Sequence, residues 1–366
     1  MFERTSVGLD VHARSIAACA LDSTTGEIIR QTLAPDDVTA WLERLPGPIA
    51  VTYEAGPTGF WLARTLAGAG IECQVAAPSR LLRAPGDRVK TDKRDAMSLA
   101  RMLRLGEIVP VRVPTADQEA MRDLCRAHAA AVKDLTHARQ RINAMLLRQG
   151  AVYPEASHWT RAHSAWLGRQ HFDHPAAQAV FESLLEAESL AVQRRKRLDK
   201  LVASAAADCE YTPVINALTC LRGIDTAAGF GLAAEIGDWT RFTGATIGSY
   251  LGLVPSEDSS GQTRRQGAIT KAGNSHARWL LAEAAWIHRR PYRRPGVRLL
   301  KQWELVDPAT RIRAQEGNQR LHRRWEAFDA RNKASTKANT AVARELAGWC
   351  WSLAVPLQQG AAMKAA

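Results

Sequence analysis

The chain has 366 residues, which is enough for two or three domains of ordinary size. Apolar residues make up 46% and charged residues 23%, a globular composition that excludes wholesale disorder and collagen-like repeats. The formal net charge of +12, carried mostly by arginine, favours a polyanionic partner.

The sequence shows no targeting or anchoring segment. Residues 1–15 contain no apolar run of signal-peptide length, and no stretch approaches the ~20 apolar residues of a membrane helix. The six cysteines are scattered without a C-x-x-C pair, so neither a zinc site nor a disulfide framework is indicated. We therefore expect a cytoplasmic, nucleoid-associated bacterial protein with reduced thiols and no membrane partner.

Residues 1–112 alternate between strand and helix patterns and predict a mixed α/β domain. Strands are expected at 6–11, 15–21, 27–33, 48–53 and 72–77. Helices are expected at about 35–44, 56–69 and 79–105, the last with a break at Pro85-Gly86.

Residues 113–211 predict a helical middle region. A first long helix is expected at 115–148 and a second at about 176–207, with a connection at 150–175 between them. An antiparallel hairpin, a dimerisation arm and a helical spacer within one protomer all fit this pattern. The first helix carries a heptad seam of Met121, Leu124, His128, Ala131, Leu135, Ala138, Ile142 and Met145.

Residues 212–355 predict a mainly helical third region, followed by a frayed tail at 356–366. The fold class is therefore α/β plus all-α. The segment Leu221–Ala227 resembles the turn of a helix-hairpin-helix, which offers backbone N–H groups to phosphate. An ordinary glycine turn between packed helices explains it equally well.

Four carboxylates form a candidate metal site. Asp10 lies in the first strand, Glu54 ends the fourth, and Asp92 and Asp95 share one helix face. Carboxylates suit Mg²⁺, and two such ions can clamp the oxygens of a phosphoryl transfer, with Mn²⁺ as an alternative. In an RNase H-like fold these positions converge at one sheet edge. Taken singly, each acid also fits a solvated or capping role.

With these residues in view, the chain resembles the DEDD transposases of bacterial insertion sequences, the bridge-RNA-guided recombinases. Their RuvC-like domain carries a strand-one Asp, a Glu in an E-A-[TG]-G-like turn and a K-T-D-x-x-D-A pair, which match Asp10, Glu54, Asp92 and Asp95. Their C-terminal domain carries G-L-x-P-x(4)-S-G and [ST]-K-A-G-[NH] blocks. This chain has the first block at 252–261 and the second at 270–274.

The resemblance implies that Ser260 is a nucleophile that attacks DNA and leaves a covalent phosphoserine. By spacing alone, Ser256 and Ser259 are equally placed, and a plain Ser-Ser-Gly turn fits as well. No histidine lies beside Ser260 in sequence, so metal ions held by the acids would have to activate its hydroxyl. The family also implies a structured guide RNA and both donor and target DNA as partners.

A basic block follows this serine. Between Arg264 and Arg298 the chain has nine cations and one acid, with Trp279, Trp286 and Tyr292 interleaved. This composition is typical of a surface that tracks phosphates and stacks on bases. The expected nucleic-acid contacts are Arg264, Arg265, Lys271, Asn274, Arg278, Arg289, Arg290, Arg293 and Arg294.

The leading interpretation is a site-specific DNA recombinase of an insertion sequence, acting as a dimer or tetramer. The alternative is a metal-dependent nuclease of the Holliday-junction-resolvase type, in which water attacks and Ser260 is irrelevant. A non-catalytic nucleic-acid-binding protein is disfavoured by the four acids.

Overall fold

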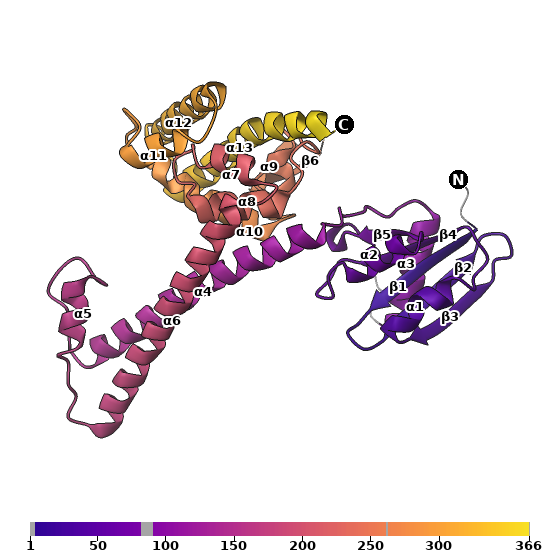
Figure 1. The fold of residues 1–366 in the computed structure, drawn as a ribbon, viewed down its shortest axis with the longest axis horizontal. Coiled ribbons are helices and arrows are strands. Elements are labelled where there is room, and N and C mark those ends of the chain that lie inside the picture. The colour runs from indigo at the N-terminus through magenta and orange to yellow at the C-terminus, as the bar shows by residue number, and fades with distance from the viewer. Residues whose placement is uncertain (1–3, 82–90, 261–262, 366) are drawn as a thin grey trace. The chain divides into compact units, whose positions relative to one another are not determined.

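The computed structural model describes residues 4–81, 91–260 and 263–365. It divides into two compact units, Met1–Thr115 and Ala116–Ala366 (Figure 1). The expected helix break at Pro85-Gly86, Lys90 of the K-T-D motif and Gly261 of the serine block lie outside the described residues.

The first unit is built on a five-stranded mixed sheet of order β3-β2-β1-β4-β5. The first three strands pair antiparallel, and β4 and β5 extend the sheet in parallel from β1. This arrangement confirms the predicted RNase H/RuvC-like fold, because it places β1 at the centre with chain reversals on one side and crossovers on the other. The strands are β1 (Thr5–Val11), β2 (Ile16–Asp22), β3 (Ile28–Leu33), β4 (Ile49–Glu54) and β5 (Glu72–Ala76).

The helices of this unit are shorter than the sequence predicts. The first is a 3₁₀ turn at Pro35–Asp37 followed by α1 (Val38–Leu42). The second, α2 (Trp61–Gly68), begins after a turn in which Gly59 has φ +70°. The predicted helix from 79 is wrong at its start, because Leu81 is extended and α3 is Asp92–Arg104.

Alternate residues of β1 face opposite layers of the unit. Val7 and Leu9 are buried in the core that α1 and α2 cover. Gly8 faces α3, and a Cβ added there would lie 2.1 Å from the carbonyl oxygen of Ala96 and 2.5 Å from the backbone nitrogen of Ala100. The missing side chain therefore lets α3 lie directly on β1, beside the strand end that carries Asp10.

Replacing Gly8 by alanine should force α3 away from β1 and destabilise this unit by about 1–3 kcal/mol, the usual cost of overpacking. Hydrogen exchange of the β1 amides, measured by mass spectrometry on the full chain, should become faster. The control is Gly68→Ala in α2, where an added Cβ meets nothing within 4 Å. Unchanged exchange in Gly8→Ala would contradict the close approach.

The second unit begins with two long antiparallel helices, α4 (Ala116–Arg148) and α6 (Pro175–Ala207), which lie side by side (Figure 1). Ion pairs fix their register: His128 with Asp199 at 2.7 Å, and Arg139 with Glu188 at 2.9 Å. A short helix, α5 (Arg161–Leu167), packs near their far end.

The heptad seam of α4 is used inside the chain. From Ala131 to Met145 its residues are buried, and Ile142 and Met145 join a cluster that includes Phe181 of α6. Of the three interpretations of this region, the structure shows the antiparallel hairpin. Because the seam already has a partner, it no longer argues for a second protomer, and self-association stays a prediction.

The rest of the second unit packs around one core that contains Phe230, Trp239 and Trp325. The last helix runs through Pro356 to Ala365, so the segment expected to be a frayed tail is helical where it is described. No helix among the described residues is long and apolar enough to cross a bilayer. The helices are α7 (Thr212–Leu218), α8 (Thr226–Ile236), α9 (Ile247–Tyr250), α10 (Ser275–Ala285), α11 (Val297–Trp303), α12 (Pro308–Asp329) and α13 (Ser335–Ala365).

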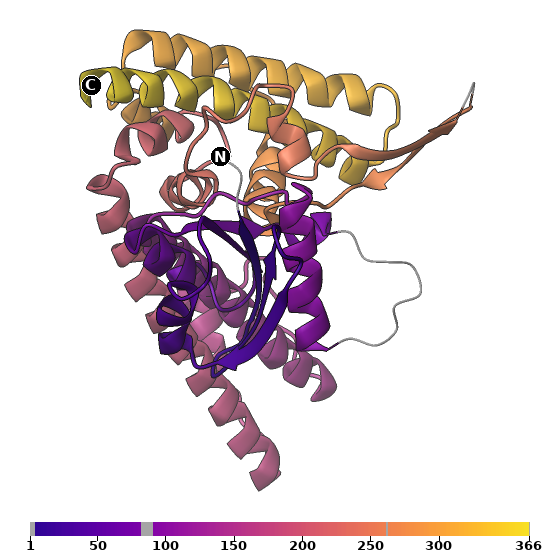
Figure 2. The same cartoon turned by 90° about the vertical axis from the view of Figure 1, so that its right-hand side faces the viewer.

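One feature of this unit was not predicted. Strands β6 (Pro255–Ser260) and β7 (Thr263–Ile269) form an antiparallel hairpin that projects from the helices of the unit (Figure 2). Most of its described side chains are exposed. The hairpin carries the three candidate serines.

Candidate functional site

The structure brings part of the predicted acid cluster together at the end of β1. Asp10, His12 and Asp92 each offer one ligand atom, and these atoms all lie within 4.8 Å of one another. The Nε2 atom of His12 lies 3.4 Å from Oδ2 of Asp10 and 3.5 Å from Oδ2 of Asp92.

Glu54 and Asp95 are not part of this cluster, although Asp95 is close enough to raise the pKa of Asp10. In the parallel pairing of β1 with β4, Leu9 is opposite Tyr53, so Glu54 follows at the position beside Asp10. Asp95 is in the first turn of α3, where Asp92 is the first residue. The four acids therefore come from adjacent strand ends and one helix terminus, as the sequence predicts.

The electrostatics of Asp10 are those of a crowded anionic site. Burial raises the pKa of the Asp10 carboxyl above its ordinary value, His12 opposes this rise, and the nearby Asp92 and Asp95 raise the pKa further. Repulsion of this kind is relieved by a cation between the carboxylates. Oxygen and imidazole donors so close together fit a divalent metal ion.

His12 was missed in the sequence analysis. Its signal is the spacing from Asp10, because residues i and i+2 of an extended strand point to the same side. A histidine two positions after an in-strand aspartate was therefore a candidate for the same site.

The two glycine-containing blocks of the second unit pack against each other. A Cβ on Gly252 would lie 2.4 Å from the carbonyl oxygen of Ala272, and one on Gly273 would lie 1.9 Å from that of Tyr250. The Lys271 amide donates to the Gly252 carbonyl at 3.1 Å, and the Thr270 amide donates to Val254 at 2.9 Å. The blocks thus close the base of the β6–β7 hairpin.

Ser260 lies at the far end of β6, opposite Thr263, and is exposed. The two neighbouring serines have other surroundings. Ser259 donates to Oε1 of Glu257 at 3.0 Å, and the Ser256 hydroxyl would clash with a Cβ on Gly267. The acids and Ser260 belong to different units.

A fully buried carboxylate, which sequence analysis did not identify, organises the second unit. Glu235 of α8 accepts two hydrogen bonds from Arg126 of α4, at 2.8 and 2.9 Å. The Asn274 amide donates to Glu235 at 2.6 Å, and Nδ1 of His276 lies 2.9 Å from it. The Asn274 carbonyl oxygen also caps α10 by accepting from Ala277.

This network changes the interpretation of Asn274. It was predicted to contact nucleic acid, but both ends of its side-chain amide are engaged within the protein. Arg278 is similar, because its guanidinium donates to the carbonyls of Leu251 and Ala272 at 3.0 and 2.9 Å. These two residues hold the K-A-G-N block, residues 271–274, in place.

The other members of the basic block lie at the surface. The Arg264 side chain is outside the described part of the structure. Lys271 is exposed in a left-handed conformation with φ 54°, and Arg265 is exposed on β7. The exposed arginines of the loop after α10 are Arg289, Arg290, Arg293 and Arg294.

The segment that resembles a helix-hairpin-helix in sequence joins α7 to α8 through a turn. Gly223 in the turn has φ +85°, and a Cβ there would lie 2.2 Å from the carbonyl oxygen of Ala284. Asp225 caps α8 by accepting from Ala228. The turn therefore combines a left-handed glycine with a tight approach to α10.

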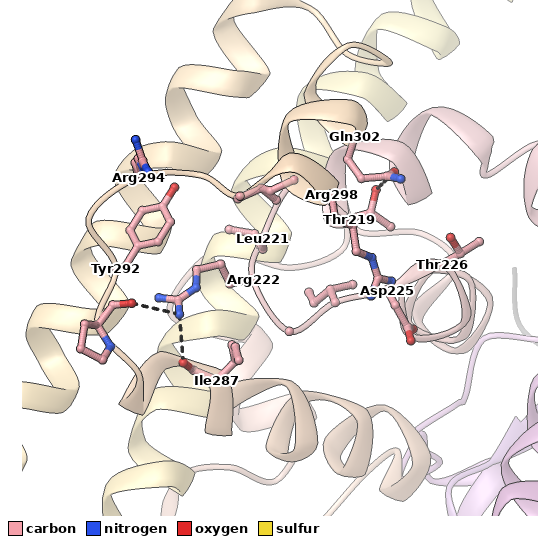
Figure 3. Close-up of a pocket in the computed structure, with 15 residues that line it drawn as sticks. Thr219, Leu221, Arg222, Asp225, Thr226, Ile287, Tyr292, Arg294, Arg298 and Gln302 are labelled. Carbon is pink, nitrogen blue, oxygen red and sulfur yellow. Dashed lines mark hydrogen bonds between the residues drawn. The ribbon is translucent and has the colours of Figure 1, made fainter. Parts of the chain in front are cut away.

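A cavity of about 450 Å³ lies between this turn and the basic loop (Figure 3). Arg222 joins its two sides: the guanidinium stacks over Tyr292 at 4.8 Å and donates to the carbonyls of Ile287 and Pro291. Arg294 and Arg298 also line the cavity. Arg222 is thus a strut that fixes the loop carrying the exposed arginines.

Burial would raise the pKa of the Glu235 carboxyl, but hydrogen bonds from His276, Arg126 and Asn274 outweigh it and lower the pKa to about 2. Because the unfolded value is near 4.5, the carboxylate stabilises the fold fully above that pH. This stabilisation is lost as pH falls from about 4.5 toward 2.

Glu235→Gln should therefore lower the unfolding free energy by about 1–3 kcal/mol at neutral pH, since it removes the buried anion that Arg126, Asn274 and His276 bind. It should also flatten the loss of stability between pH 4.5 and 2. Thermal melts across this range check both effects. Glu283→Gln, on the exposed face of α10, is the control. A melt identical to wild type would contradict the structural role.

The fold and the acid cluster define a DEDD-type, RuvC-like domain followed by a helical second unit. A family described as "Transposase", of the DEDD IS110 type, matches residues 7–149. A second, described as "Transposase IS116/IS110/IS902 family", matches residues 215–297.

Known proteins show the same relationship over most of the chain. The putative transposase y4qE of Sinorhizobium fredii is 45% identical over 308 residues, covering 84% of this chain and 75% of that protein. The transposase for insertion sequence element IS1533 of Leptospira borgpetersenii is 28% identical over 350 residues, covering 92% and 100%. The chain belongs to the IS116/IS110/IS902 family of transposases.

Proposed function

We propose that this transposase cuts and rejoins donor and target DNA of an insertion sequence, with a structured guide RNA. The observation that carries the proposal is the meeting of Asp10, His12 and Asp92 at the end of β1. Acids with this placement suit phosphoryl transfer, because held cations can stabilise charge on phosphate oxygens. Family membership supports the DNA chemistry.

In this proposal Asp10, Glu54, Asp92 and Asp95 hold Mg²⁺, two ions per site, with Mn²⁺ as an alternative. A bound divalent cation supplies Lewis-acid stabilisation of the phosphate. Two features of the fold support this assignment: β1 and β4 are adjacent parallel strands that carry Asp10 and Glu54 near their ends, and Gly8 allows α3 to lie directly on β1.

Asp10→Asn should abolish strand cleavage while leaving DNA affinity within about twofold, because the acids contribute no attraction to phosphate. Mn²⁺ titration followed by electron paramagnetic resonance should show loss of the bound ion in the variant. Asp36→Asn, an exposed acid elsewhere in this unit, is the matched control. Normal cleavage by Asp10→Asn, or cleavage that survives EDTA, would refute the metal site.

We assign the nucleophile to Ser260, following the family motif. Its hydroxyl oxygen would bond to phosphorus while the hydroxyl proton leaves, and the bridging deoxyribose oxygen would depart as a protonated hydroxyl. The phosphodiester is thereby exchanged for a phosphoserine, so rejoining needs no ATP. The exposed position at the end of β6 supports access to DNA.

Ser260→Ala should form no covalent complex with labelled target DNA in the presence of guide RNA, since the bond-forming oxygen is gone. Wild type should give an adduct that resists SDS and disappears with protease. Ser256→Ala and Ser259→Ala are controls that should retain the adduct. Continued cleavage by Ser260→Ala would instead favour the resolvase-type alternative in which water attacks.

The partner assignments rest on charge and position. Arg265, Arg289, Arg290, Arg293 and Arg294 are exposed on the second unit and are proposed to contact phosphates. Recombination joins several DNA ends, so we also propose a dimer or tetramer as the working form. In that form one protomer's serine could act with another protomer's acids.

A further inference from the structure

Two hollows meet on one face of α13, outside the basic block. The first, of about 430 Å³, lies between α12, α13 and the loop before α9. The second, of about 600 Å³, lies between α13 and the base of the β6–β7 hairpin. Both are lined by Ala341 and Arg344, so they adjoin at these residues, and we call the two together the α13 groove.

The groove follows a single helical stripe. Lys337, Ala341, Arg344 and Gly348 succeed one another at spacings of four, three and four, which places them on one face of α13. Gly248 of α9 forms part of the opposite wall, and a Cβ there would lie 2.9 Å from Cγ of Arg344. The glycine leaves room for the arginine stem to lie against this wall.

The lining is strongly basic. Its single acid is Glu345, and that carboxylate is already paired with Arg320 at 2.9 Å and with Arg324 at 3.6 Å. The cations that line it are Arg313, Arg324, Lys333, Lys337 and Arg344.

Three of these cations have no acidic partner among the described residues, and one of them, Lys333, lies over the Phe328 ring at 4.6 Å. Lys337 and Arg344 are exposed, and neither forms an ion pair with a described residue. Arg313 lies over the ring of Trp349 at 4.3 Å, so the only aromatic ring in the lining is covered. The groove thus offers positive charge without a free ring for base stacking, which suits a phosphate backbone read without regard to sequence.

The groove leads toward the proposed nucleophile. Pro255, Gln266 and Gly267 of the hairpin line its second half. In the hairpin register Gln266 is opposite Glu257, and Ser260 follows three residues further, about 10 Å at the rise of a β-strand. A strand lying in the groove would therefore continue toward Ser260.

We infer that the α13 groove binds the phosphate backbone of the DNA strand that flanks the phosphodiester cut by this transposase. The inference rests on the proposed function for its choice of DNA, since the hairpin that walls the groove carries Ser260. It assigns a role to the segment after residue 296, which contains most of the lining cations.

The test is a double variant, Lys337→Gln with Arg344→Gln, in the full-length protein. Fluorescence anisotropy with a labelled single-stranded oligonucleotide should show about 25-fold weaker binding at 0.1 M salt. The log–log salt slope should fall by about 1.4, which corresponds to two lost phosphate contacts on a single strand. An affinity and slope equal to wild type would overturn the inference.

Matched variants separate a local contact from net charge and from misfolding. Arg197→Gln with Lys200→Gln removes one arginine and one lysine from the exposed face of α6 and should bind within about twofold of wild type. Lys337→Arg with Arg344→Lys should restore binding. Equal losses in the α6 pair, or no rescue by the swapped pair, would overturn the assignment to this groove.

A photo-crosslinker at Thr340, which lines the groove, identifies the occupant. Crosslinking to the DNA strand beside the cut supports the inference, and crosslinking to guide RNA alone overturns it. The adduct assay keeps the two proposals apart. If the groove variant binds DNA weakly but the wild-type protein forms no covalent adduct, only the nucleophile assignment is refuted. If the groove variant binds DNA as the wild type does and the wild type forms a normal adduct, only the groove assignment is refuted.

Discussion

The acid site depends on the absence of a side chain at Gly8. At Gly8 the backbone of α3 approaches β1 so closely that even a methyl group would overlap the Ala96 carbonyl. This contact sets the height of α3 above the sheet and brings Asp92 within reach of His12 and Asp10. A larger residue at this position would push α3 away from β1 and so move Asp92 away from Asp10. The geometry of the acid cluster thus depends on the packing of α3 against β1.

In the second unit the corresponding constraint is electrostatic. Glu235 of α8 lies fully buried where α4, α8 and the start of α10 meet, and its partners come from α4 and from the start of α10. A buried charge tolerates few arrangements, because each lost hydrogen bond leaves it poorly solvated. The K-A-G-N block is therefore held from one side by this carboxylate and from the other by the Gly252 contact. The hairpin that carries Ser260 rises from that fixed base.

Much of this could be predicted from sequence. The five strands are short apolar runs bounded by turn residues, so the fold was accessible. The positions of Asp10 and Glu54 near strand ends, and of Asp92 and Asp95 on one helix, could be read from the sequence with it. The β6–β7 hairpin was missed because its residues are polar and exposed. Such a strand lacks the alternation of apolar and polar residues from which a strand is predicted. The contact of Asn274 with Glu235 was missed because the two residues are 39 positions apart and no local pattern links them. The start of α3 was misplaced because Leu81 is extended although nothing in its spacing forbids a helix.

The solvent-exposed hairpin has a consequence for how the reaction is restricted to the correct DNA. A two-stranded ribbon without a buried face is marginally stable by itself, so its conformation is governed by what it touches. In the proposed mechanism, the Ser260 hydroxyl at the end of β6 is oriented for attack only when DNA and protein together fix the ribbon. The free-energy cost of ordering the hairpin then reduces the free energy of DNA binding. This cost weakens the binding of unsuitable DNA most, because such DNA makes fewer contacts to offset it. An enzyme that breaks chromosomes benefits when its reactive group is assembled by the correct target and is ineffective elsewhere.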